Sequence, residues 1–119
     1  MHRKQLLGEI GEDLACDFLK RKDYTILKRN FKCRQGEIDI IGKDKKRNEI
    51  VFFEVKTRTN MQYGEASEAV NKMKRQHIYK AIEYYIYTHP FEKIPIRIDV
   101  IEVYFIDNKF KINHIKQAF

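Results

Sequence analysis

The sequence predicts an α/β fold in which a mixed five-stranded sheet is flanked by helices, as a three-layer sandwich. Apolar residues recur at three- and four-residue spacing in two segments and form short alternating or continuous runs in five others. These elements follow in the order helix, three strands, helix, two strands. Because 119 residues with 43% hydrophobic content can fill one core, we expect residues 1–119 to form a single domain.

Two segments have the spacing of amphipathic helices. The first covers the first 22 residues, and its apolar stripe consists of Leu7, Ile10, Leu14 and Phe18. The second begins with Asn71 as its N-cap and ends before Pro90. We expect its inward stripe to consist of Met73, His77, Ala81 and Tyr84.

Five segments have the composition of strands, namely residues 24–31, 37–41, 49–57, 96–105 and 110–115. Residues 51–53 are apolar on both faces, which predicts a central position for the third segment. In the fourth, the apolar phase shifts by one residue at Ile101, which predicts a bulge or bend. The last segment is expected at a sheet edge, where a second copy of the chain could pair as a homodimer.

The charge of the chain favours a polyanionic partner. Lys and Arg number 24 against 17 Asp and Glu, for a net charge of +7, and basic clusters of this kind make nucleic acid the first partner to consider. No apolar run approaches the roughly 20 residues of a membrane-spanning helix, and the start lacks a signal-peptide core. Cys16 and Cys33 make neither a disulfide framework nor a zinc site, so we expect free thiols in the cytoplasm.

Acidic and basic side chains stand in two apolar strands. Glu54 and Lys56 are two apart, so they share one face at roughly 6.6 Å. Asp39 can face the same side if its strand pairs with theirs. Two carboxylates and the Val55 carbonyl would suit Mg²⁺, or Mn²⁺, with Glu37 as a rival ligand. The alternative is an ordinary surface ion pair on a strand, which is common and weak.

Three stretches carry a resemblance, namely residues 11–15, residues 30–41 and residues 51–58. With them the chain resembles the YraN family of small bacterial proteins, which is similar to the PD-(D/E)XK nuclease superfamily and most closely to archaeal Holliday junction resolvases. The resemblance implies a restriction-endonuclease-like fold. It also implies that Asp39 and Glu54 are metal ligands, that Lys56 is the catalytic lysine and that Glu12 is an outer acid holding a metal-bound water.

The resemblance further implies that Arg58, Lys74 and Arg75 contact phosphates, a role that needs no base specificity. Ile38 stands where the superfamily motif has proline. We therefore expect a Mg²⁺- or Mn²⁺-dependent endonuclease that hydrolyses DNA, with branched DNA as the substrate that the resolvase likeness suggests. The alternatives are a nucleic-acid-binding protein that keeps the nuclease fold without turnover, and a purely structural partner in a protein complex.

Overall fold

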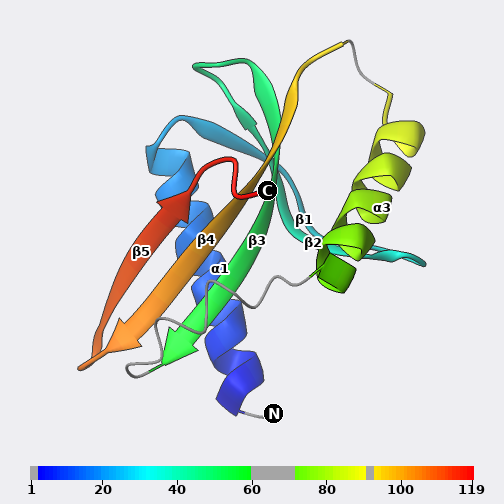
Figure 1. The fold of residues 1–119 in the computed structure, drawn as a ribbon. Coiled ribbons are helices and arrows are strands. Elements are labelled where there is room, and N and C mark those ends of the chain that lie inside the picture. The colour runs from blue at the N-terminus through cyan, green and yellow to red at the C-terminus, as the bar shows by residue number, and fades with distance from the viewer. Residues whose placement is uncertain (1–2, 60–71, 91–92) are drawn as a thin grey trace.

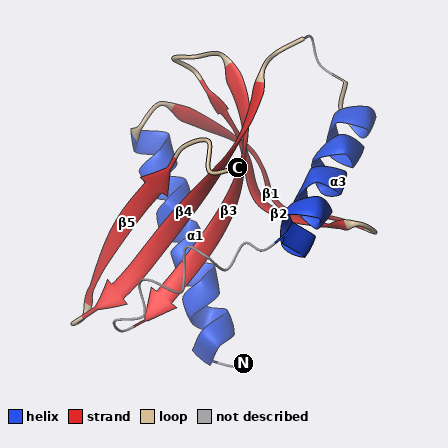
Figure 2. Cartoon of the chain, in the orientation of Figure 1, coloured by secondary structure: helices blue, strands red, loops and turns tan. Residues whose placement is uncertain are grey.

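The computed structural model describes residues 3–59, 72–90 and 93–119. These residues form two helices and five strands in the predicted order (Figures 1 and 2). The elements are α1 (Arg3–Arg21), β1 (Tyr24–Cys33), β2 (Gly36–Asp44), β3 (Glu49–Thr59), α3 (Lys72–Thr88), β4 (Ile96–Ile106) and β5 (Lys109–Ile115). The prediction that Asn71 is an N-cap lies outside the described residues.

The strands form one mixed sheet in the order β1-β2-β3-β4-β5. β3 and β4 are parallel, and the other neighbouring pairs are antiparallel. The parallel pair requires a long crossover, and α3 lies within the segment that provides it. β3 lies between β2 and β4 as its apolar composition predicted, and β5 lies at a sheet edge.

The two helices cover opposite faces of the sheet (Figure 1). On one face, Ile78, Ile82 and Tyr85 of α3 belong to the same cluster as Phe31, Ile38, Ile41 and Phe52. On the other, Ala15, Cys16 and Leu19 of α1 belong to the same cluster as Ile40, Phe53, Ile101 and Val103. The α/β class and the restriction-endonuclease-like layering are thus confirmed.

The predicted inward stripe of the second helix was largely wrong. Met73 is 67% exposed, Tyr84 is 45% exposed and His77 is also exposed. The buried residues are Ile78, Ala81, Ile82 and Tyr85. The buried face therefore includes Ala81 but is turned by about one residue, because two isoleucines fill the space above the sheet better than methionine and histidine.

The predicted stripe of the first helix also needs correction. Ile10 is 38% exposed, and Leu14 and Phe18 are only partly buried. The deeply buried side chains are Ala15, Cys16 and Leu19. The small residues Gly11 and Ala15 allow the helix to approach β3 closely, which a spacing rule that counts only large apolar residues does not detect.

The bulge predicted at Ile101 is absent from β4. Its register with β3 is continuous from Ile96 to Phe105, and the bulge of this sheet lies in β1 between Ile26 and Lys28. The apolar phase changes because β4 is buried on both faces and because Arg97 and Asp99 are themselves buried. In a strand buried on both faces, the pattern of polar and apolar residues does not show which side chains share a face.

Candidate active site

β2 and β3 separate at the residues that the sequence singled out. Their pairing runs from Asp44 and Glu49 to Ile40 and Phe53, and Asp39 and Glu54 come directly after it. Beyond this point β2 continues beside β1, and β3 continues beside β4. The Val55 N–H donates a hydrogen bond of 2.7 Å to Asp39 Oδ2. A carboxylate therefore bridges the two strands where the backbone ladder stops.

Glu54 and Lys56 are buried on the side of β3 that faces α3. They alternate with Phe53 and Val55, which pack in the cluster below α1. Glu54 is 8% exposed and Lys56 is 7% exposed. The interpretation of Glu-x-Lys as a solvent-exposed ion pair is therefore wrong, and charged groups at this depth need specific partners.

The acidic groups around Asp39 act strongly on its carboxylate. Burial and the negative charge of Glu54 raise the pKa of Asp39 to about 7, against the hydrogen bond from Val55 N–H. The charges of Glu12 and Glu37 add to the rise. Asp39 thus exchanges its proton near neutral pH, and a cation would favour its charged form.

Lys56 has the opposite tendency. Burial lowers the pKa of its ammonium, and the nearby charges of Lys74 and Arg58 lower it further. The carboxylates of Glu54 and Asp39 act against this shift. The charges of Glu54 and Asp39 thus act on Lys56, and that of Glu54 acts on Asp39. The expectation that Asp39 shares a face with Glu54 required paired strands, and the pairing of β2 with β3 ends one residue before both.

Glu12 approaches Asp39 from α1. It lines an open cavity of about 730 Å³ with Asp39, Val55 and Glu37. Arg29 holds it in place, since Nε donates to Glu12 Oε1 at 3.2 Å while Nη2 binds Asp13 Oδ1 at 2.7 Å. Glu54 and Lys56 do not line this cavity. Asp39 thus lies between two groups. It shares a cavity with Glu12 of α1, and the charge of Glu54, which faces α3, raises its pKa.

The three residues expected to contact phosphates lie in different surroundings. Lys74 Nζ lies 2.7 Å from Glu54 Oε1, and although burial acts to lower its pKa, the bond to Glu54 raises it overall. The guanidinium of Arg75 lies over the Phe119 ring at 5.0 Å. Arg58 is half-buried on β3, two residues beyond Lys56. Lys74 thus contacts one of the candidate ligands directly.

These residues fit a divalent cation that takes one or two carboxylates and keeps several waters. The raised pKa of Asp39 indicates negative charge that lacks sufficient compensation. Within the described part of the chain, however, no three His, Cys, Asp or Glu side chains are grouped to hold a metal. A cation shared by Asp39 and Glu54 would meet the ammonium of Lys74, which already bonds Glu54 Oε1.

Sequence reasoning missed two residues near this site. Arg29 is separated from Glu12 by 17 positions, so no local sequence pattern predicts their contact. Glu102 on β4 is 2% exposed and is the register partner of Lys56. Asn113 Nδ2 donates to its Oε1 at 2.9 Å, while Oε2 has no hydrogen-bond partner among the described residues. The position of this glutamate between Ile101 and Val103, in a strand of mostly apolar residues, could have indicated a buried acid.

Comparison with known proteins found a matching family and relatives that span nearly the whole chain. A model of the family described as "Uncharacterised protein family UPF0102" matches residues 11–103. A UPF0102 protein of Caldicellulosiruptor bescii is 51% identical over 123 residues, with both chains covered completely. UPF0102 protein TTE1452 of Caldanaerobacter subterraneus subsp. tengcongensis is 46% identical over 119 residues, covering 98% of this chain and 96% of that protein.

A third relative, UPF0102 protein CLJ_B2665 of Clostridium botulinum, is 47% identical over 116 residues, which cover 95% of this chain and 93% of that protein. None of the helices in the described residues is long and apolar enough to cross a membrane. The match of nearly the whole chain confirms the resemblance to the family, and the chain belongs to the UPF0102 (YraN) family.

Proposed function

We propose that this chain is a metal-dependent endonuclease that hydrolyses DNA phosphodiester bonds. The observation that carries the proposal is the position of Asp39 at the separation of β2 and β3. There its carboxylate bonds Val55 N–H and has its pKa raised to about 7 by burial and by Glu54. A buried carboxylate with a strongly raised pKa beside a buried lysine is typical of catalytic sites.

The residues have distinct roles in this proposal. Mg²⁺ or Mn²⁺, when bound, supplies Lewis-acid polarisation of the scissile phosphate and lowers the pKa of an attacking water. Asp39, Glu54 and the Val55 carbonyl are the proposed ligands. Glu12, held by Arg29, positions water on the α1 side. Lys56 is the proposed catalytic lysine, whose Nζ either accepts a proton from the attacking water or, as an ammonium, stabilises charge developing on the phosphate.

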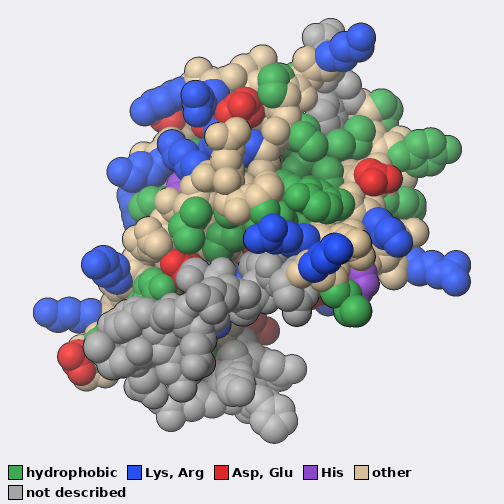
Figure 3. Space-filling view, in the orientation of Figure 1, with side chains coloured by type: hydrophobic (Ala, Val, Ile, Leu, Met, Phe, Trp, Pro, Cys, Tyr) green, Lys and Arg blue, Asp and Glu red, His purple; other side chains and the backbone are tan. Residues whose placement is uncertain are grey.

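The charge of the molecule supports a nucleic-acid substrate. The chain has a net charge of +7, and Lys and Arg side chains surround much of the face seen in Figure 3. We propose that Arg58, Lys74 and Arg75 contact the DNA backbone near the site. We propose branched DNA as the substrate, in cytoplasmic DNA processing, and a two-fold symmetric junction would call for a homodimer.

One contact favours a second candidate, a nucleic-acid-binding protein without turnover. The ammonium of Lys74 bonds Glu54 at 2.7 Å, in the place where a metal ion would need that carboxylate. A chain that keeps this ion pair when DNA is bound would recognise phosphates and leave them intact. The two candidates make opposite predictions for divalent-dependent product.

A cleavage assay separates them. End-labelled duplex, single-stranded, flap and four-way-junction DNA are incubated with Mg²⁺, Mn²⁺ or EDTA. The parent is compared with the near-isosteric variant Glu54→Gln and with Glu83→Gln, which removes the same charge from an exposed position on α3. We expect metal-dependent products from the parent and from Glu83→Gln, and at least a hundredfold loss in Glu54→Gln.

Each outcome has a definite meaning. Products that persist unchanged in Glu54→Gln would remove Glu54 from the proposed site. Absence of products with every DNA, together with salt-sensitive binding of the same DNAs, would support the second candidate. Preference for one DNA structure would identify the substrate class, and the junction is the expected one.

A further inference from the structure

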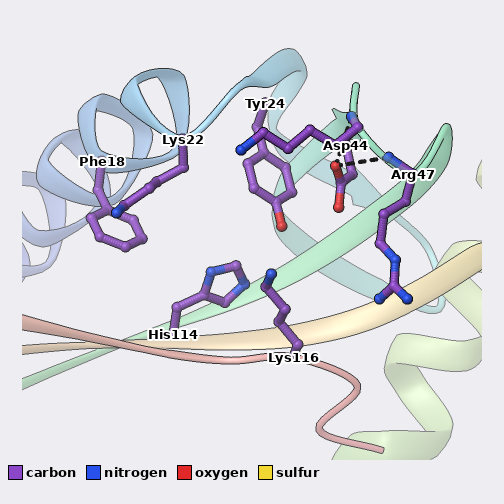
Figure 4. A pocket seen from close by; sticks show the side chains of 8 residues that line it. Phe18, Lys22, Tyr24, Asp44, Arg47, His114 and Lys116 are labelled. Carbon is purple, nitrogen blue, oxygen red and sulfur yellow. Dashed lines mark hydrogen bonds between the residues drawn. The ribbon is translucent and has the colours of Figure 1, made fainter.

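A second cavity lies at the other end of α1 from the candidate active site. It has a volume of about 420 Å³ and lies between the end of α1, the start of β1, the β2–β3 turn and the end of β5. Its lining includes four cationic side chains from three separate segments, namely Lys22, Lys46, Arg47 and Lys116. Figure 4 shows His114 and Lys116 extending from the end of β5 toward Tyr24 and Asp44.

The carboxylate in this cavity already has its donors. Asp44 Oδ1 accepts hydrogen bonds from the backbone N–H groups of Lys46 and Arg47 at 3.1 and 3.3 Å (Figure 4). Its Oδ2 accepts one from Arg97 Nη1 at 3.0 Å. Asp44 is 4% exposed, so its charge is balanced from below and does not require the lysine side chains above it.

The acids outside the cavity hold these cations only loosely. Lys46 Nζ lies 3.7 Å from Asp23 Oδ2, and Arg47 Nε lies 3.9 Å from Glu49 Oε1. Both distances exceed the roughly 2.7–2.9 Å of a charge-assisted hydrogen bond. Lys22 Nζ lies 5.7 Å from the Phe18 ring centre. The cations therefore have donors with which they can bind a ligand anion.

His114 adds an oriented group to the wall. Its Nε2 lies 2.7 Å from Asp99 Oδ2, and Asp99 is itself held by Arg97 and by the backbone N–H of Gln117. The ring also makes edge contacts with Phe18 and Tyr24. The imidazole is thus fixed through Nε2, and Nδ1 is the ring nitrogen with which it can meet a ligand.

We propose that this cavity binds a phosphate group. Converging lysine and arginine side chains beside an oriented imidazole provide charge-assisted donors that suit a phosphate, and an aromatic wall accommodates the sugar or base attached to it. The phosphate belongs either to a free nucleotide or to a nucleic-acid strand. Lys22 directly follows α1 and lies ten positions after Glu12, which corresponds to roughly 15 Å at the rise of a helix. A strand cleaved at the candidate active site could therefore reach both places.

The test compares two double variants with equal charge change. Lys46→Ala with Lys116→Ala removes two cavity cations, whereas Lys109→Ala with Lys111→Ala removes two exposed cations of β5 outside the cavity. Calorimetry measures the binding of inorganic pyrophosphate and AMP. Fluorescence anisotropy measures the binding of a single-stranded DNA at several salt concentrations. All four residues are exposed, so both variants should fold as the parent does.

We expect the cavity variant to bind at least one probe tenfold more weakly than the parent, while the control stays within a factor of two for that probe. Loss confined to pyrophosphate and AMP assigns the site to a small phosphate ligand. Loss confined to DNA, with a salt slope reduced by about 1.4, assigns it to the strand backbone, because each contact to a single strand contributes about 0.7. Equal losses in both variants, or no loss in either, would overturn the proposal. Because no arm measures cleavage, its failure is distinct from failure of the proposed nuclease activity.

Discussion

Lys74 Nζ on α3 lies 2.7 Å from Glu54 Oε1 on β3. A helix side chain therefore bonds one oxygen of the carboxylate that the proposed metal site needs. Lys74 follows a stretch of chain outside the described residues, at the beginning of α3. The ion pair links the position of α3 to the state of the site. Metal binding and the Lys74 contact are therefore expected to compete.

Replacing Lys74 by methionine tests this competition. The Lys74→Met variant removes the ammonium but keeps an unbranched side chain, so Glu54 becomes available to a cation. We expect Mn²⁺ to bind about tenfold more tightly without DNA, as monitored by electron paramagnetic resonance. Arg75→Met is the matched control, because it removes the same charge from the neighbouring position. The guanidinium of Arg75 lies over the Phe119 ring, so its removal should not change Mn²⁺ affinity at Glu54. Equal tightening in both variants would show an effect of net charge alone.

Asp39 should make the stability of the metal-free protein depend on pH. Its folded-state pKa of about 7 lies above the ordinary value of 3.8, so the folded state binds the proton more tightly. The resulting stability is complete below pH 4 and is lost as pH rises toward 7. A shift of about three pKa units at roughly 1.4 kcal/mol each leads us to expect that Asp39→Asn increases the free energy of unfolding by several kcal/mol at pH 8 and by much less at pH 4.

Urea denaturation in EDTA measures this difference at both pH values. Asp17→Asn, at an exposed position on α1, serves as the control and should change little at either pH. An Asp39→Asn variant that is less stable at pH 8 than at pH 4, relative to the parent, would contradict the sign of the shift.

Two glycines of α1 should respond in opposite directions to alanine. A Cβ at Gly11 would clash with Thr57 Oγ1 on β3, whereas a Cβ at Gly8 meets no atom of the described residues within 4 Å. We expect Gly11→Ala to destabilise the protein by about 1–3 kcal/mol through overpacking. Gly8→Ala should stabilise it by about 0.5–1 kcal/mol, because alanine favours the helix. Thermal unfolding of both variants checks this, and destabilisation by both would refute the packing argument.

Arg97 should contribute strongly to the free energy of unfolding, and this contribution should depend on pH in the acid range. Its guanidinium, 1% exposed, bonds Asp44, Glu49 and Asp99. Burial acts to raise the pKa values of Asp44 and Asp99, but hydrogen bonds, including those from Arg97, hold both below their ordinary value. We expect Arg97→Met to cost about 3–5 kcal/mol at pH 7, because it leaves buried carboxylates without their partner.

The pH dependence of unfolding provides the second readout for Arg97. Groups with lowered pKa values stabilise the folded state above about pH 4, and this stability is lost as pH falls through the lowered values. The parent should therefore lose stability below pH 4, and Arg97→Met should lose less over the same interval. An equal slope in both proteins would mean that Arg97 does not lower these pKa values. If Arg97→Met fails to fold, Asp44→Asn provides the same comparison.

The composition of short segments predicted much of the fold. The five strands, both helices and the central place of β3 follow from local patterns such as the apolar run at Val51–Phe53. The same patterns predicted that Glu54 and Lys56 share one face of β3, because strand geometry places alternate residues on one face. They did not predict that β2 and β3 separate directly before Asp39 and Glu54. The inward face of each helix was predicted less well, since it depends on how closely the helix can approach the sheet.

By itself the sequence determined the order of elements, the basic surface and the carboxylates and lysine of the candidate site, because these depend on residue type and on spacing within a few positions. Only the tertiary structure decided which charges meet across long separations. Arg29 forms an ion pair with Glu12, and Lys74 forms one with Glu54. Arg97 forms ion pairs with carboxylates of β2, β3 and β4. Such contacts form because buried charges need partners, and the folded sheet, rather than any local pattern, determines which partners lie within reach.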